Sequence, residues 1–219
     1  MLTDKQIRQI EQHSGEPELR YSNIMFVIGQ LESLLTNQKA KEYLLHGAGR
    51  RANILVNCIR NIFSTYPVRK KDLLTEDERI TCCISLHAFM INIVGFIDNL
   101  AWVFVHEKQL SIRKEAVSLF KEKTAQYLTP DFQSYLNTRK LWYGDYLLIY
   151  RHSLAHQIAP YIPPYGFIYD TGDVVPHAGF ATTLDGNVMM LHPQLISDFH
   201  TIEEIIQNFQ KFEFPVRRH

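Results

Sequence analysis

The stretch that decides the fold is ISLHAFMINIVGFIDNLAWVFV, residues 84–105, which is apolar on nearly every side of a helix. A run of this length could cross a membrane. Asp98 lies within it, however, and a carboxylate near the middle of a bilayer is costly. A helix that is apolar all round is typical of the centre of a helical bundle. We therefore predict a buried central helix and expect no membrane partner.

The sequence on both sides of this run predicts further helices. Thr75 and Glu78 form a capping-box pattern, so the central helix should begin there and run to about His106. Apolar side chains recur at helical spacing over residues 24–35, and the glycines of His46-Gly47-Ala48-Gly49 are typical of a helix end. An amphipathic helix is expected over residues 111–126, and another after Thr129-Pro130, where threonine can cap and proline can occupy the first helical position.

The character of the chain changes at Pro160, because Pro160-Tyr161-Ile162-Pro163-Pro164 cannot continue a helix. Beyond it we expect a hairpin turn at Asp185-Gly186-Asn187 and a final helix over residues 194–211, with short strands at residues 167–169, 180–183 and 188–191. The predicted fold is mainly α: an antiparallel helical bundle of four to six helices with a short C-terminal β-hairpin region and a closing helix. We assign residues 1–160 to the bundle and residues 161–219 to a C-terminal extension packed on the same domain.

Composition and charge narrow the functional classes. Lys+Arg and Asp+Glu are equal, at 23 each in 219 residues, so net charge does not indicate a nucleic-acid-binding protein. Short basic runs are more typical of solvated surface; they are Arg50-Arg51, Arg69-Lys70-Lys71 and Arg217-Arg218. The cysteines are odd in number and form no C-x-x-C pattern, which argues against a disulfide framework and a zinc site. With no signal-peptide pattern in the first residues, we expect a cytoplasmic protein.

Functional chemistry is concentrated in Tyr150-Arg151-His152-Ser153-Leu154-Ala155-His156, near the end of a helix expected to run from about Asn137 to just before Pro160. Arginine can bind two phosphate oxygens, and histidine can move protons near neutral pH. Arg151 and His156 are five residues apart, however, which is roughly 500° of rotation and leaves them about 140° apart on an ideal helix. Either the last turn deforms, or two copies of the helix meet across a dimer and combine their residues.

The Arg-x4-His pattern of Arg151 and His156, in a mostly helical chain, resembles the HEPN superfamily (higher eukaryotes and prokaryotes nucleotide-binding domains) over roughly residues 18–160. This resemblance implies a bundle of four or five helices and, in many members, a metal-independent endoribonuclease of a defence or toxin–antitoxin system. It implies Arg151, His156 and His152 as catalytic residues, with RNA or a nucleotide as ligand, no cofactor, and a homodimer or an antitoxin as partner.

Further substrate-binding residues are expected around this motif. Asp98 and Asn99 resemble the polar residues that some HEPN proteins bring towards the arginine. Tyr161, between prolines, could offer a face on which a base stacks.

Three other interpretations of the same residues stay open. The fold could serve a non-catalytic interaction or binding domain. His152 and His156 share one helix face at a spacing used by zinc ligands, and with His87 or His106 they would resemble the metal-binding DinB-like bundles. Arg151 could instead be an ion-pair partner of Asp98 inside the bundle.

Overall fold

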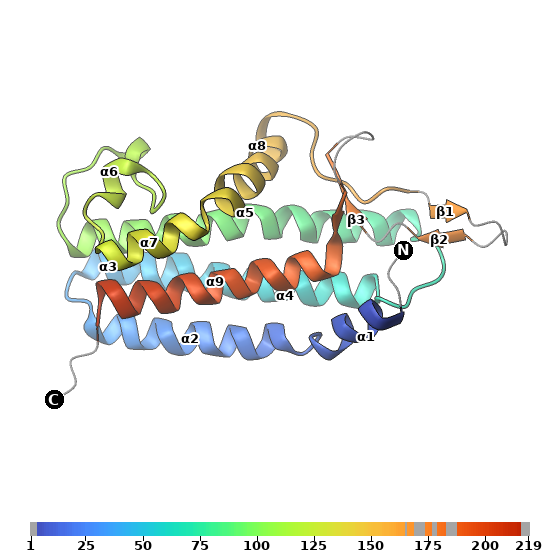
Figure 1. The fold of residues 1–219 in the computed structure, drawn as a ribbon, viewed down its shortest axis with the longest axis horizontal. Helices are drawn as coiled ribbons and strands as arrows, with labels where there is room; N and C mark the ends of the chain where they lie inside the picture. Colours follow the sequence, from blue (N-terminus) through green and yellow to red (C-terminus); the bar gives the residue numbers. More distant parts are fainter. Residues whose placement is uncertain (1–3, 165, 169–173, 177–178, 183–187, 216–219) are drawn as a thin grey trace.

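The computed structural model describes residues 4–164, 166–168, 174–176, 179–182 and 188–215, and it confirms the mainly α fold with a short hairpin region and a closing helix. Four long helices lie side by side and enclose the core (Figure 1). They are α2 (Glu16–Leu34), α4 (Arg50–Thr65), α5 (Glu76–Glu107) and α9 (Leu191–Glu213).

Shorter elements connect and flank the long helices. On the N-terminal side these are α1 (Asp4–Gln12), α3 (Gln38–Glu42) and the π-helical turn η1 (Tyr43–Gly49). After α5 follow η2 (Lys114–Ala116), α6 (Glu122–Ala125), α7 (Pro130–Thr138), a second π-helical turn η3 (Trp142–Leu147) and α8 (Leu148–His156). The strands are β1 (Gly166–Ile168), β2 (Val174–Pro176), β3 (Gly179–Phe180) and β4 (Met189–Met190).

The central helix begins where the sequence predicts. The Thr75 backbone N–H donates to the Glu78 carboxylate at 2.8 Å, and the Glu78 N–H donates to the Thr75 hydroxyl at 3.3 Å, which completes the capping box. By its length and apolar composition alone, α5 could cross a membrane. Core helices of water-soluble proteins can have the same length and composition. One side of α5 is buried in the bundle, with Phe89, Phe96 and Phe104 at the core.

The closing helix is a central part of the bundle. Leu195, Phe199, Ile202, Ile206 and Phe209 of α9 are fully buried, so residues after Pro160 complete the core that the earlier helices begin. α9 runs in the same direction as α2 (Figure 1). Arg20 near the start of α2 bonds Glu203, and Gln30 further along α2 bonds Gln210, so the residue numbers of the bonded pairs rise along both helices. α4 runs antiparallel to α2 and α5. α7 and α8 lead from the end of the bundle at which α6 lies towards the end at which α9 begins (Figure 1).

Two predictions about helix boundaries were wrong, and a third was confirmed. His46-Gly47-Ala48-Gly49 does not end a helix, because the chain stays helical from α3 through η1 into α4. Residues 111–126 form only η2 and α6, since Val117, Ser118 and Leu119 between them are buried in an irregular segment. The helix expected from about Asn137 to just before Pro160 is present: the chain is helical from residue 140 through η3 to the end of α8 at His156, after α7 has ended with Arg139 as its C-cap.

The predicted strands are present but short. β1 pairs antiparallel with β2, with Phe167 opposite Val175. β3 pairs antiparallel with β4, with Phe180 opposite Met189, and Leu191 already belongs to α9. The expected turn at 185–187 lies outside the described residues, as do Tyr169 and Thr183. Thr129 caps α7 by accepting from the Phe132 N–H, with Pro130 at the first helical position, as predicted.

Candidate functional site

α8 is anchored on α5 and presents its polar residues outward. Tyr150 is buried against Phe180, with ring centroids 5.3 Å apart, and Ser153 is buried with its hydroxyl donating to the Ile149 carbonyl at 2.9 Å. Just beyond the helix, His87 of α5 contacts the Pro160 carbonyl at 2.5 Å. This arrangement fixes which side of α8 faces the solvent.

The three predicted catalytic side chains, Arg151, His152 and His156, are all exposed on α8. Arg151 and His152 line a shallow hollow of about 480 Å³, whose lining is completed by Gly144, Leu148, Ile149 and Gln157. His156, the last residue of α8, does not line this hollow, although its ring lies 4.9 Å from that of His152. The structure therefore brings Arg151 and His152 together and leaves His156 to one side, as the helical spacing requires.

Asp98 lies near Arg151 without bonding to it. Burial raises the pKa of the Asp98 carboxyl, against the opposing effect of the positive charges of Arg151, Lys121 and Arg51. No ion pair within 4.0 Å joins Asp98 to Arg151 among the described residues, and Arg151 is exposed rather than enclosed by the bundle. The buried ion pair considered from the sequence is not formed.

Asn99 lies away from the residues of α8, and the backbone of Tyr161 is paired with a strand residue. Asn99 faces the other side of α5, where it accepts from Arg51 Nε at 3.1 Å. Tyr161 pairs through its backbone with Ala181, at 2.9 and 3.1 Å, and its side chain is partly buried. The expected placement of Asn99 beside Arg151 is therefore not found, because its side chain is bonded to Arg51 of α4.

For the alternative of a three-histidine metal site, no third ligand lies beside His152 and His156 in the described part of the chain. His87 is bonded to the Pro160 carbonyl, and His106 stacks on Tyr43 and Trp102. Among the residues that the structure describes, no group of three or more His, Cys, Asp and Glu side chains could hold a metal ion.

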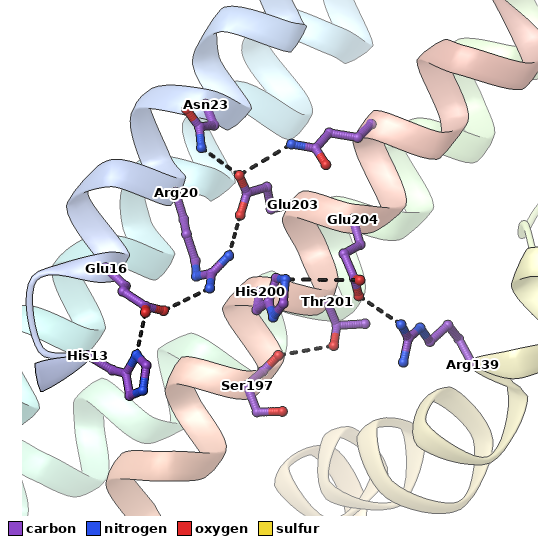
Figure 2. Close-up of polar contacts among 11 residues, drawn as sticks. His13, Glu16, Arg20, Asn23, Arg139, Ser197, His200, Thr201, Glu203 and Glu204 are labelled. Atoms are coloured by element: carbon purple, nitrogen blue, oxygen red, sulfur yellow. Dashed lines mark hydrogen bonds and ion pairs between the residues drawn. The ribbon is translucent and has the colours of Figure 1, made fainter. Parts of the chain in front are cut away.

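A cavity of about 680 Å³ lies between the α1–α2 turn and α9, and the arginine that lines it is paired with two carboxylates. Arg20 donates to Glu16 at 2.7 Å and to Glu203 at 2.6 Å, and Glu16 also contacts His13 (Figure 2). Asn23 donates to Glu203 as well. This network ties α2 to α9 and engages Arg20, the one arginine or lysine among the described residues that line the cavity.

A buried carboxylate that sequence analysis did not identify lies on α9. Asp198 is fully buried and accepts hydrogen bonds from Trp142 Nε1 at 2.8 Å, Tyr146 Oη at 2.8 Å and Gln194 Nε2 at 2.7 Å. Burial raises its pKa to about 6, against the opposing effect of these three bonds. The carboxylate joins η3 to α9 and so fixes the turn from which α8 continues.

The remaining basic pairs of the sequence differ in their environment. Arg69 pairs with Glu11 on the surface, and Lys70 pairs with Glu78 in a partly buried position. Arg51, by contrast, is partly buried between α4 and α5, and no sequence signal separated it from its exposed neighbour Arg50. Arg217 and Arg218 lie outside the described residues.

No protein-family model, curated protein sequence or solved structure matches this chain.

Proposed function

We propose that the protein is a HEPN-like RNA- or nucleotide-binding protein whose site is the exposed face of α8, acting as a metal-independent endoribonuclease. The observation that supports this most is the placement of Arg151, His152 and His156. All three are exposed on a helix whose other side is anchored by Tyr150 and Ser153. A cation and two proton carriers are thereby held on a rigid element and open to a polymer.

The chemistry that this arrangement supports is cleavage by the RNA's own 2′-hydroxyl. A histidine accepts the 2′-hydroxyl proton, the O2′–P bond forms, and the P–O5′ bond breaks as a second histidine donates a proton to O5′. The guanidinium of Arg151 binds the non-bridging oxygens and stabilises the charge that develops on them. The products are a 2′,3′-cyclic phosphate and a free 5′-hydroxyl, and no metal takes part.

A homodimer through α8 would bring His156 to this chemistry. On one chain His156 does not line the hollow beside Arg151. Two exposed apolar side chains line the hollow, Ile149 at 52% and Leu148 at 37% exposure, and Ile158 just after α8 is 61% exposed. A second copy seated on this face would cover these side chains and supply its own His156 to the Arg151 of the first copy. Ile149→Glu should then make the protein monomeric in light scattering and reduce cleavage together with dimerisation.

The test is incubation with labelled single-stranded RNA in EDTA, followed by analysis of the product ends. We expect cleavage by the parent protein, loss of cleavage in Arg151→Ala and His156→Ala, and no loss in matched variants of exposed residues elsewhere, Arg113→Ala and His200→Ala. Cleavage that requires added metal would exclude this mechanism.

A non-catalytic binding domain is the second candidate function, and one observation favours it. A catalytic histidine usually has a hydrogen-bond partner that fixes its tautomer. Among the described residues, neither His152 nor His156 has such a partner. RNA binding that Arg151→Ala abolishes, without cleavage by the parent protein, would support this function over the nuclease.

A further inference from the structure

A second polar hollow lies on another side of α5, between this helix and the continuous segment formed by η1 and α4. Its volume is about 660 Å³, within the range of roughly 300–1,000 Å³ that is usual for small-molecule sites. We call it the Arg51 cleft. Its lining includes Lys39, Glu42, Tyr43, Arg50, Arg51 and Asn99.

Arg51 is held in this cleft by neutral groups alone. Its Nη1 donates to the Asn92 side-chain oxygen at 2.8 Å, and its Nε donates to that of Asn99 at 3.1 Å. No carboxylate lies within 4.0 Å of its guanidinium in the described part of the chain. Arg20 in the other large cavity is different, because Glu16 and Glu203 neutralise it (Figure 2). The guanidinium of Arg51 is therefore fixed in position with no carboxylate in contact with it among the described residues, and Asp98 acts on its charge only at longer range.

Two glycines make this arrangement possible. A Cβ at Gly95 would lie 2.5 Å from Cζ of Arg51, and a Cβ at Gly47 would lie 2.7 Å from Cγ of Asn99. Any larger residue at either position would displace the side chain that it meets. Glycine at both positions therefore leaves the space that the side chains of Arg51 and Asn99 occupy.

The rim of the cleft adds further positive charge and an aromatic wall. Lys39 and Arg50 are exposed cations, and Glu42 is the single carboxylate among the lining residues. Tyr43 stacks on Trp102, with ring centroids 5.6 Å apart, and on His106, at 5.1 Å, so its ring has little freedom. η1, which carries Tyr43, is a π-helical turn, a feature frequent at functional sites.

We propose that the Arg51 cleft binds a small organic phosphate. The phosphate lies on the guanidinium of Arg51 between Arg50 and Lys39, and the organic part lies against Tyr43 and Ile54. A guanidinium presents paired donors that match two phosphate oxygens. The site is separate from α8, so the proposal does not depend on nuclease activity.

The experiment is calorimetric titration of the parent protein with pyrophosphate, adenosine diphosphate and adenosine at fixed ionic strength. We expect both phosphates to bind, adenosine diphosphate more tightly, and adenosine not to bind. Asn99→Asp is the decisive variant, because it keeps the shape of the side chain and places a carboxylate against Arg51. It should weaken phosphate binding by about tenfold or more, since the charge of Arg51 is then neutralised. Arg113→Ala, which removes an exposed arginine outside the cleft, should change the Kd by less than about twofold.

Gly95→Ala provides a second variant. The added Cβ displaces only the flexible end of Arg51, while alanine favours helix by about 1 kcal/mol relative to glycine. We expect it to stay folded and to lose phosphate binding, with RNA cleavage unchanged in both cleft variants. Equal phosphate affinity in the parent, Asn99→Asp and Gly95→Ala would overturn the proposal, as would an equal loss in Arg113→Ala. Loss of RNA binding in the cleft variants, without any binding of pyrophosphate or adenosine diphosphate, would assign the cleft to RNA and also overturn it.

Discussion

Replacing Asp198 by asparagine should stabilise the protein at neutral pH and change how its stability depends on pH. The side chain is fully buried, and burial raises the pKa of its carboxyl from 3.8 to about 6 in the folded protein. Between these two values the folded protein binds more protons than the unfolded chain. Its free energy of unfolding therefore falls as the pH rises through this window. A shift of about two pKa units corresponds to about 3 kcal/mol.

Asparagine can keep the three hydrogen bonds without the charge. Its carbonyl oxygen can accept from Trp142 and Gln194, and its amide can donate to the Tyr146 oxygen once that hydroxyl has rotated. Asp198→Asn should exceed the parent in stability by about 1–3 kcal/mol at pH 8, after allowance for the rearranged bond, and should match it near pH 4. Asp198→Ala should be less stable than the asparagine variant by about 2–4 kcal/mol at every pH, because donors then lack an acceptor.

The quantity to measure is the difference in unfolding free energy between variant and parent, from urea titrations followed by circular dichroism at pH 4–8. The difference is needed because His192 acts in the opposite sense. Burial lowers the pKa of His192 to about 4, so its contribution to stability rises from about pH 4 to 6.5 and partly masks that of Asp198. A difference that does not vary with pH, or a less stable asparagine variant at pH 8, would refute this reasoning.

Three further predictions concern single side chains. Arg151→Ala should keep its melting temperature within a few degrees of the parent while losing RNA binding or cleavage, because the side chain is exposed; a large fall in melting temperature would show that the arginine is structural. Thr75→Ala should lower the unfolding free energy by about 1 kcal/mol, since it removes the cap of α5, and an unchanged urea midpoint would contradict this. His192→Gln can keep a donor for the Tyr66 carbonyl, which lies 2.6 Å from Nε2, and should resist acid between pH 6.5 and 4 better than the parent; an identical acid transition would exclude His192 as the titrating group.

Local sequence signals predicted the elements that depend on local bonds. The start of α5 could be predicted because Thr75 and Glu78 bond each other, and the start of α7 because Thr129 and Pro130 act within one turn. The glycines of η1 misled the prediction for the opposite reason. Gly47 lies in a helix and is small because Asn99 approaches it from α5, a contact 52 residues away in sequence.

The candidate site on α8 could be predicted as a set of residue types, but its surroundings could not. Helical spacing correctly separated Arg151 from His156, and it also determines that Asp98 and Asn99 diverge. The environment of Arg51 depends on Asn92 and Gly95 of another helix, and that of Asp198 on η3. The hydrophobic pattern within one helix does not show which residues of a distant helix will contact it.

The π-helical turn η1 has a consequence for insertions and deletions in this chain. A π turn holds an additional residue compared with the regular α-helix on either side. Deleting a single residue within residues 43–49 would therefore restore regular winding and leave the helical segments before and after the turn in nearly the same relative orientation. A deletion of one residue in the regular part of α4 would instead rotate everything before it by about 100° about the helix axis, and Lys39 and Tyr43 would then face away from Arg51. The turn is thus the place in this helical segment where the chain can lose one residue and keep its packing on α5.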